Sequence, residues 1–326
     1  MSGYAVEIRD YGDYTAIELH DGYSQAKATL IPECGNNLIA YACRGKPVIT
    51  PPPDMTAFIG NSGIRTWYGI PILFPPNRVK GGRFSFEGTE YVLPINEPPH
   101  YHLHGDLSRK PWIVDGYGAA EENGAYVTCS FHFKDHPDIL AYYGHELSFT
   151  VTYTLDKGRL DMHIAAVNHG SKRAPFAFGL HPYLAVPASS GPCTLVVPAA
   201  EQWPITPLSF VTGEPSATEL CGQWRRGVAL ADYPEAGCFM FTLSEEDRIC
   251  RLEMKEAGYR IAYEPDRSFP VVLLFKPGWA DAFSIEPYTC VTDAFNLHYP
   301  DELTGARGLS PGEEVQMSTG LWVELV

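Results

Sequence analysis

The sequence has few basic residues for its size and no apolar run of membrane length. Lys and Arg together number 24, Asp and Glu number 39, and the formal net charge is −15. Nucleic-acid binding usually needs a concentrated basic patch, so this balance argues against a nucleic-acid partner. The most notable apolar run, FPVVLLF at 269–275, is far too short to span a bilayer. We therefore expect no membrane partner, and a neutral or weakly charged ligand.

Signals for export, disulfides and zinc knuckles are also missing. The first residues, MSGYAVEIRDYGDY, contain neither a basic leader with an apolar core nor a small-residue cleavage site, which predicts a cytoplasmic location. The cysteines form no CxxC pair, and in a chain of 326 residues we expect them to be buried free thiols. They are Cys34, Cys43, Cys129, Cys193, Cys221, Cys238, Cys250 and Cys290.

Several catalytic signatures are absent as well. No GxGxxG follows a predicted strand, no GxxxxGK[ST] occurs, and there is neither a GxSxG elbow nor an HExxH helix. The usual signs of a nucleotide cofactor and of serine-hydrolase chemistry are therefore missing.

What the sequence does contain is period-two alternation, the pattern of amphipathic strands. Apolar residues alternate through 147–155 and again through 160–164, with the turn DKG between them, which predicts a hairpin. A strand is predicted over 126–134, and a tight hairpin over 83–93 turning at Glu87-Gly88. The 28 prolines and 30 glycines fit many strands joined by turns. We predict one all-β domain over 1–326, in which 187–237 forms loops and short strands.

The stretch PPHYHLHGD places three histidines at alternate positions, His100, His102 and His104. In an extended segment they would share one face. A solvated or structural face, a metal site and acid–base or binding chemistry are all open interpretations. Against metal, the following residues GDLSRKPWIV offer only Asp106 as a further ligand.

A second informative stretch is APFAFGLHPYL, residues 174–184. If it is extended, Phe176, Phe178 and Leu180 share the face opposite to His181. The small residues on the histidine face, Ala177 and Gly179, would leave room for a ligand. A structural role and a functional role for His181 both remain open at this point.

The third stretch is DAFSIEPYTCVTDAFNL, residues 281–297. Phe283 and Ile285 are predicted to face the core, which places Ser284 and Glu286 on the opposite face. If that face is concave and desolvated, the pKa of Glu286 rises toward values useful to a general base. A carboxylate base and a histidine acid together suit a reaction that removes one proton and delivers another.

These stretches resemble the aldose 1-epimerase (galactose mutarotase-like) family. The resemblance lies in PILFPPNRVKGGRFSFEGTEYVLPINEPPHYHLHGDLSRKPW at 71–112, in VNHGSKRAPFAFGLHPYL, and in IEPYTCVTDAFN with GLSPGEEVQMSTGLWVEL near the end. The three segments occur in the family order and cover most of the chain.

The resemblance implies a large antiparallel β-supersandwich with few short helices and a shallow sugar site that needs no metal or cofactor. It further implies a cofactor-independent isomerase in which Glu286 takes the C1 hydroxyl proton and His181 protonates the ring oxygen. His104 would assist catalysis, and Arg78 with Asn77 would bind sugar hydroxyls. The expected partner is a small-molecule sugar, and the expected state is a monomer or homodimer.

Two departures from the family pattern concern the substrate. Ala236 occupies the place of an aspartate that grips sugar hydroxyls, and Leu273 occupies that of a glutamine. The main alternative is a hexose-6-phosphate 1-epimerase, whose phosphate would call for converging arginines such as Arg65, Arg78 and Arg83. A non-catalytic carbohydrate-binding protein on the same fold is a further alternative.

Overall fold

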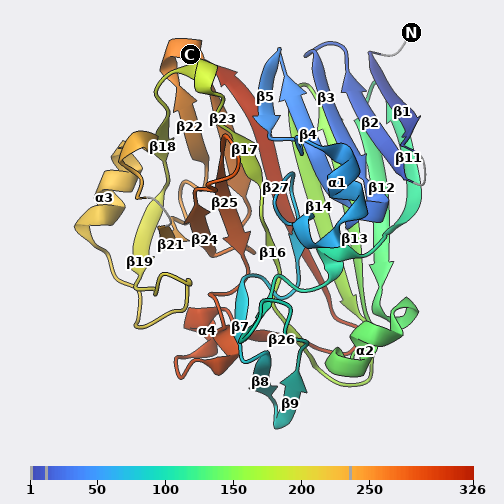
Figure 1. Ribbon diagram of the computed structural model, residues 1–326, viewed down its shortest axis with the longest axis vertical. Helices are drawn as coiled ribbons and strands as arrows, with labels where there is room; N and C mark the ends of the chain where they lie inside the picture. The colour runs from blue at the N-terminus through green and yellow to red at the C-terminus, as the bar shows by residue number, and fades with distance from the viewer. Residues whose placement is uncertain (1–2, 12–13, 235–236) are drawn as a thin grey trace.

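The computed structural model describes residues 3–11, 14–234 and 237–326, and they are mainly antiparallel strands. Two large sheets dominate, and their strands run roughly along the long axis of the molecule (Figure 1). The N- and C-termini lie at the same end of this view. The predicted all-β supersandwich with few short helices is confirmed.

The larger sheet has twelve strands. Its main path runs through β1 (Tyr4–Asp10), β2 (Thr15–Asp21), β3 (Ala26–Ile31), β4 (Asn37–Cys43), β5 (Lys46–Ile49), β17 (Tyr183–Ala185), β25 (Ala282–Tyr288), β24 (Val271–Phe275), β21 (Cys238–Leu243) and β19 (Ala199–Trp203). Off this path, β16 (Gly179–Leu180) pairs with β25 and with β6 (Ile72–Leu73).

The second sheet has nine strands. Their order is β11 (Ile113–Ala120), β12 (Gly124–His132), β13 (Leu147–Asp156), β14 (Arg159–Asn168), β27 (Glu314–Leu325), β23 (Tyr259–Pro265), β22 (Cys250–Met254), β18 (Thr194–Val196) and β20 (Val228–Ala229). Three strand pairs stand apart, namely β7 (Arg78–Lys80) with β10 (Tyr101–Leu103), β8 (Arg83–Phe86) with β9 (Thr89–Val92), and β15 (Ala174–Phe176) with β26 (Arg307–Leu309).

Helices are few and short. The α-helices are α1 (Met55–Gly60), α2 (Pro137–Tyr143), α3 (Glu219–Arg226) and α4 (Asp301–Thr304). The 3₁₀ helices are η1 (Pro32–Cys34), η2 (Ser62–Ile64), η3 (Leu107–Arg109), η4 (Phe133–Asp135), η5 (Ala188–Ser190), η6 (Leu230–Asp232), η7 (Lys255–Ala257) and η8 (Ala294–Asn296). Within the described ranges, no helix has both the length and the apolar character needed to cross a membrane.

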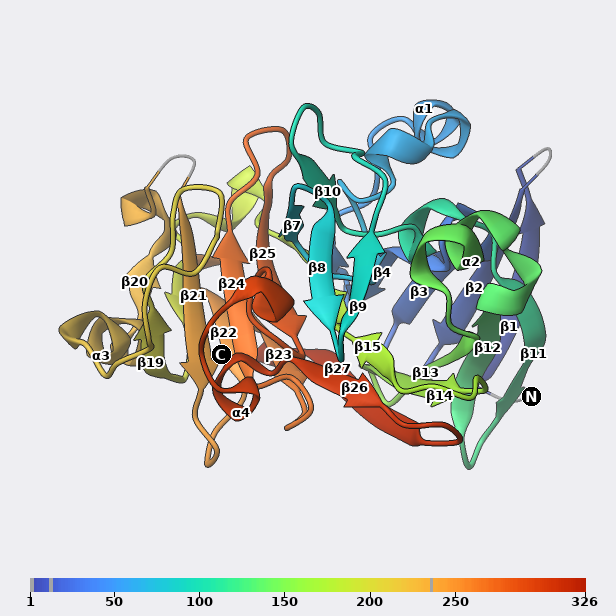
Figure 2. The same cartoon turned by 90° about the horizontal axis from the view of Figure 1, so that it is seen from below.

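The main core lies between the two large sheets. Buried apolar side chains of both sheets form one continuous cluster, to which β25 contributes Phe283 and Ile285, as predicted. Because side chains alternate along a strand, Ser284 and Glu286 face away from this core. Their face is covered in part by a second apolar cluster that includes Leu273 and Tyr288. Figure 2 shows the small pairs β7–β10 and β8–β9 near the middle of the molecule, between the two ends of the large sheets.

The hairpin predictions are confirmed, whereas the sequence patterns located none of the short helices, including α3 in a region predicted to form loops and short strands. The turn between β13 and β14 falls at 157–158, and β8 and β9 meet at Glu87-Gly88. Strand β12 covers residues 126–132 of the strand predicted over 126–134, whose last two residues lie in η4 instead. Within 187–237, however, α3 begins at an N-cap, Thr218, whose side chain accepts from the backbone of Cys221. Its sequence ELCGQWRR buries only Cys221 and Trp224 and has a glycine in the middle, so the helical pattern was weak.

The cysteines are free thiols, as predicted. All eight cysteines are free, and seven of them are buried. Cys238 on β21 is partly exposed and lies close enough to Ser209 for a side-chain hydrogen bond.

Candidate active site

Glu286 lies in the middle of the larger sheet, on the face turned away from the second sheet. Its strand β25 is flanked by β17 on one side and β24 on the other, with Tyr183 opposite Ser284 and Leu273 opposite Glu286. The residue is 1% exposed, which for a charged residue type requires nearby polar partners.

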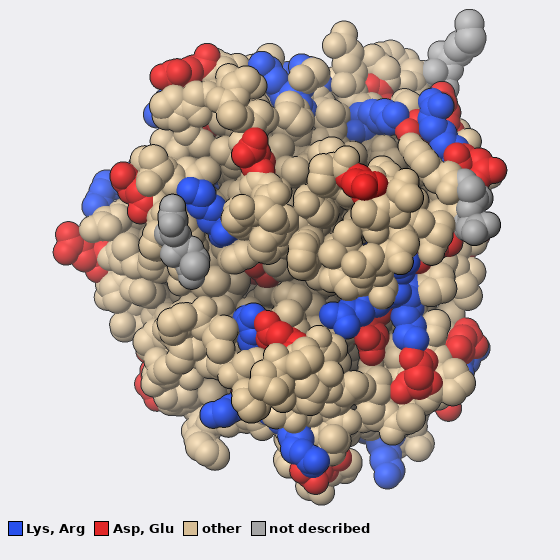
Figure 3. Space-filling view, in the orientation of Figure 1, with Lys and Arg blue, Asp and Glu red and all other residues tan. Residues whose placement is uncertain are grey.

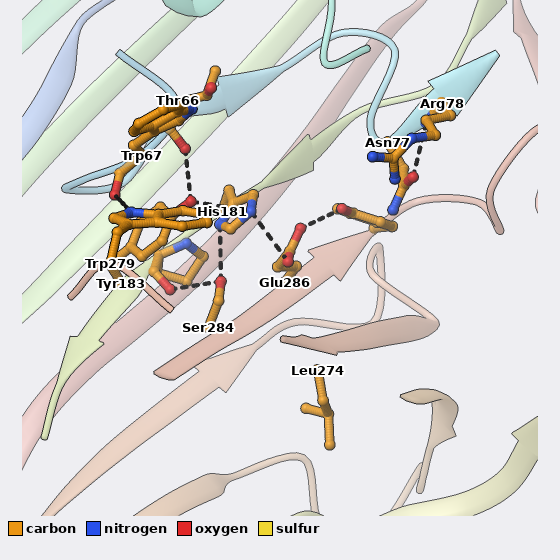
Figure 4. A network of polar contacts seen from close by, with 12 residues as sticks. Thr66, Trp67, Asn77, Arg78, His181, Tyr183, Leu274, Trp279, Ser284 and Glu286 are labelled. Carbon is orange, nitrogen blue, oxygen red and sulfur yellow. Dashed lines mark hydrogen bonds and ion pairs between the residues drawn. The ribbon is translucent and has the colours of Figure 1, made fainter. Parts of the chain in front are cut away.

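Glu286 and His181 contact each other directly. Oε1 of Glu286 lies 3.2 Å from Nε2 of His181, and the histidine is 5% exposed. His181 follows β16 and precedes β17, so Pro182 ends the pairing of one short strand before the next begins. The contact joins two residues more than a hundred positions apart in the sequence, as Figure 4 shows.

Ser284 fixes the orientation and tautomer of His181. Its hydroxyl donates to the carbonyl oxygen of Pro182 at 2.9 Å, and its Oγ is also 2.9 Å from Nδ1 of His181. A hydroxyl has one hydrogen to give, so Oγ accepts from Nδ1–H. In the neutral ring the lone pair is then on Nε2, the atom that faces Glu286. Ser284 thereby aims the basic nitrogen of the imidazole at the carboxyl group.

Burial controls the protonation of this pair. It raises the pKa of Glu286 to about 8, although the hydrogen bond from Tyr288 and the charge of Arg78 act in the opposite direction. Burial lowers the pKa of His181 to about 3. Both shifts favour the neutral form, in which the one proton of the pair belongs to Glu286 and is donated to Nε2. Near neutral pH, protonated Glu286 is therefore the proton donor of the pair and Nε2 of His181 is the acceptor.

Tyr288 and Asn77 hold the other side of the carboxyl group. The hydroxyl of Tyr288 donates to Oε2 of Glu286, and the side chain of Asn77 hydrogen-bonds Tyr288 in turn. Oδ1 of Asn77 also accepts from the backbone N–H of Arg78 at 2.9 Å. Asn77 has a left-handed backbone, with φ of 54°, which asparagine tolerates better than most residues. The predicted binding residue Asn77 is thus buried and organises its neighbours.

His104 completes the floor of the site. Its ring centroid is 5.5 Å from that of His181, and its backbone N–H donates to the carbonyl of Asn77 at 2.9 Å. A Cβ on Gly105 would come within 1.7 Å of the carbonyl oxygen of Phe74, so only glycine fits after His104. Burial, followed by the nearby His181 and Arg78, lowers the pKa of His104 well below its ordinary value. Nδ1 of His104 has no hydrogen-bond partner among the described residues.

Arg78 is held by a carboxylate that the sequence interpretation did not single out. Its Nε and Nη2 each lie 2.6 Å from a different oxygen of Glu97 and form a bidentate pair. Nη1 does not take part in this pair. Nη1 lies 3.5 Å from the backbone oxygen of Leu208. Both side chains are partly buried, which makes this pair less screened than a surface salt bridge.

The family resemblance implies a sugar substrate, and for that substrate we expect Glu97→Gln to raise KM about 3- to 10-fold with a smaller effect on kcat, because Arg78 loses its fixed orientation. Release of the guanidinium from its counter-charge also lowers the pKa of Glu286, so the alkaline limb of the pH–rate profile moves to lower pH. Steady-state kinetics across pH check both effects. Glu90→Gln, which breaks the exposed pair between Arg83 and Glu90, is the control. An unchanged KM and profile would refute this positioning role.

The prediction that three alternate histidines share one face is wrong. Strand β10 covers only Tyr101–Leu103, and the backbone turns left-handed at His104, with φ of 63°. His100 is exposed, whereas His102 is buried and its Nδ1 lies 2.7 Å from the carbonyl oxygen of Pro94. Only His104 of the three reaches the pair. The carboxylate of Asp106 accepts from Tyr142 instead of joining the histidines.

The predicted free space beside His181 is also wrong in detail. A Cβ at Gly179 would lie 2.4 Å from the ring of Tyr288 and 2.8 Å from Pro76. The missing side chain therefore makes room for Tyr288, the hydrogen-bond donor to Glu286. Phe176, Phe178 and Leu180 on the opposite side are in the core, as predicted.

Arginines do not converge on the site as the phosphate alternative would require. Arg65 is buried and donates to the backbone oxygens of Arg109, Ile59 and Glu33, and Arg83 pairs with Glu90. Of the three candidates, only Arg78 lies close to Glu286.

Leu273 and Ala236 are the two positions that depart from the family pattern, and the structure describes only Leu273. Leu273 lies directly across from Glu286 in the register of β24 and β25 and is 2% exposed, so the strand beside the carboxyl group offers no amide there. Ala236 lies outside the described residues.

Comparison with known proteins identifies the family and supports the fold. The family model for aldose 1-epimerase matches residues 16–322. The chain belongs to the aldose 1-epimerase family. A galactose mutarotase-like protein from Clostridium acetobutylicum has the same fold, with a TM-score of 0.89 at 23% identity over 99% of both chains. Galactose 1-epimerase from Lactobacillus acidophilus gives a TM-score of 0.80 at 16% identity, covering 100% of this chain and 99% of its own.

Similar sequences match this aldose 1-epimerase family member over shorter lengths. Uncharacterized protein YihR from Escherichia coli is 33% identical over 117 residues, which is 35% of each chain. Galactose mutarotase from Mus musculus is 27% identical over 208 residues, or 60% of this chain and 58% of its own. The chain therefore matches about a third to somewhat over half of the length of these two relatives.

Four residues that shape the site were not assigned a role from the sequence, namely Ser284, Tyr288, Glu97 and Tyr183. Ser284 and Tyr288 lie two positions on either side of Glu286, so the period-two alternation that placed Ser284 on its face extends to Tyr288 as well. Glu97 belongs to the NE element of the family-like segment 71–112. Tyr183 stacks on His181 with ring centroids 4.5 Å apart, a contact set by the break between β16 and β17.

Proposed function

We propose that the protein is an aldose 1-epimerase that interconverts the α and β anomers of a hexose or a related neutral sugar without a cofactor. The observation that carries this proposal is the 3.2 Å contact between Glu286 and His181 on one buried floor. In a cyclic sugar, the C1 hydroxyl oxygen and the ring oxygen are bonded to the same carbon. An adjacent base and acid can therefore serve both oxygens at once.

In the proposed reaction Glu286 takes the proton of the C1 hydroxyl while His181 gives a proton to the ring oxygen. The bond between C1 and the ring oxygen breaks and the C1 carbonyl forms, so no electrons leave or enter. Rotation about the C1–C2 bond and reclosure on the other face reverse both proton transfers. The pair begins by moving its proton from Glu286 to Nε2 of His181, and the positive charge of Arg78 favours the ionised carboxylate.

In this proposal substrate binding uses polar groups near the pair whose hydrogen bonding is weak or incomplete. Nη1 of Arg78 has a long contact of 3.5 Å with the backbone oxygen of Leu208, and the buried Nδ1 of His104 has no partner among the described residues. Both are suited to hydrogen bonds with sugar hydroxyls. In the space-filling view the middle of this face is hollowed and carries scattered charges of both signs (Figure 3). The absence of converging arginines near Glu286, within the described residues, supports a neutral sugar over a sugar phosphate.

The test is exchange NMR between the anomeric protons of glucose, galactose, xylose and arabinose, with and without the protein. Exchange well above the buffer rate for at least one sugar is the expected result. Faster exchange of glucose 6-phosphate than of glucose would replace the neutral sugar with the phosphorylated one. Binding of a sugar with no acceleration of exchange would favour the non-catalytic carbohydrate-binding alternative, with which Leu273 opposite Glu286 is compatible.

A further inference from the structure

We propose that the exposed tryptophans Trp67 and Trp279 bind a second sugar ring, so that the preferred substrate is a reducing disaccharide or a longer oligosaccharide. This rests on the proposed function, because the first ring is the one that Glu286 and His181 open.

The two tryptophans form a fixed aromatic surface. Each is 42% exposed, and their ring centroids are 5.2 Å apart with an angle of 37° between the planes. Nε1 of Trp279 donates to the carbonyl oxygen of Trp67 at 3.2 Å, so the indole already has a polar partner. What Trp279 offers outward is therefore its aromatic face. Ordered aromatic side chains make effective binding surfaces because little conformational freedom is lost on binding.

The contact between Trp67 and Trp279 joins two separate loops. Trp67 follows η2, whereas Trp279 lies in the turn between β24 and β25, 212 positions later. Single exposed apolar side chains need no explanation, but two large ones held in contact beside a buried acid–base pair indicate a binding surface. No core position or strand pairing requires this contact, since both residues lie outside the strands.

One aromatic ring lies between His181 and Trp279. The ring of His181 contacts Tyr183 at 4.5 Å and Phe275 at 6.0 Å between centroids. These two rings in turn contact Trp279, at 6.4 Å and 5.7 Å. Trp279 is therefore connected to His181 through one intervening aromatic ring, on a side of the site that a second sugar ring, linked to the first, can contact.

The two ends of the site differ in chemistry, as the two sides of a sugar do. In Figure 4 the tryptophans lie on one side of His181, and Asn77 and Arg78 lie on the other. A pyranose presents hydroxyls at its edge and C–H groups on its face. The hydroxyl-rich edge of the first ring suits Arg78 and His104, whereas the C–H face of the next ring suits the indole surface.

The experiment compares exchange kinetics of glucose and galactose with those of maltose, cellobiose and lactose. We expect at least one disaccharide to have a kcat/KM about 10-fold above that of its reducing monosaccharide, through stacking on the indole surface. Trp279→Ala and Trp67→Ala should remove this preference while leaving the monosaccharide rate within about 2-fold. Trp322→Ala is the control, because Trp322 lies on β27 of the other sheet under Arg159.

A calorimetric titration separates this inference from the proposed reaction. Glu286→Gln protein is titrated with the same sugars, with and without Trp279→Ala. Disaccharide binding that exceeds monosaccharide binding and depends on Trp279 supports the second subsite, even if the wild type exchanges no sugar. The inference is overturned if the protein shows no preference for any disaccharide, or if Trp279→Ala weakens both sugar classes equally.

Discussion

Glu286→Gln is expected to lower kcat for anomer exchange by about 10³-fold, the usual value for loss of a well-placed general base. The amide keeps the shape of the carboxyl group. Its oxygen can still accept from Tyr288 and its N–H can donate to Nε2 of His181, so both existing contacts are retained in kind. The substitution therefore removes proton transfer and little else. Exchange NMR with the best substrate of the panel measures the loss.

The same substitution should stabilise the protein at high pH, because Glu286 is costly to ionise where it lies. Its folded-state pKa of about 8 exceeds the ordinary value of 4.5. The stability contributed by the neutral group is fully present below pH 4.5 and is lost as the pH rises through 8. We expect Gln to stabilise the fold at pH 8 by on the order of 2–4 kcal/mol relative to wild type, and hardly at all at pH 4.5.

Asp293→Asn is the matched control for both measurements. Burial raises the pKa of Asp293 to about 6, so its removal should also stabilise the fold at high pH, but by less. Asp293 accepts from the backbone of Lys80 and from Asn296 and is not part of the acid–base pair. Full exchange activity in Glu286→Gln would end the catalytic proposal, and equal loss in Asp293→Asn would show that the effect is not specific to the pair.

Local alternation was enough to predict several of the strands and the face that carries Glu286. The turns after Asp156 and at Glu87-Gly88, and the outward face shared by Ser284 and Glu286, are properties of short segments. Strand geometry dictates them directly, because successive side chains point to opposite faces. This local rule failed at His104, where the backbone is left-handed at both His104 and Gly105 and any side chain at 105 would collide with the backbone of Phe74, a feature that alternation does not reveal.

Contacts between distant segments could not be predicted from these patterns. The register that brings Leu273 opposite Glu286 depends on how β24 and β25 pair, and the Arg78–Glu97 pair depends on a loop before β10. The resemblance to a family supplied Glu286 and His181 together. It could not supply the contact between Trp67 and Trp279, because that contact depends on the conformations of two loops.

His181→Gln is expected to lower kcat by about 10²- to 10⁴-fold, because glutamine cannot carry a proton between Glu286 and the ring oxygen. Its side chain can still hydrogen-bond Ser284 or Glu286, which preserves packing on the floor of the site. His100→Gln is the control, since His100 is exposed and does not contact the pair. Comparable losses in both variants would mean that the effect does not come from the acid–base pair.

In His181→Gln the rate should change with pH in the opposite direction to the wild-type rate. This is the stronger test of whether Glu286 and His181 share one proton. In wild type the pair must hold one proton, so kcat/KM should fall as the pH rises through about 8, when Glu286 loses it. The acid limb lies far lower, toward the His181 pKa of about 3. In His181→Gln the only chemistry left is base catalysis by Glu286, which requires the ionised carboxylate. The residual rate should therefore rise through the pH range in which the wild-type rate falls, and parallel profiles would show that the two groups do not share a proton.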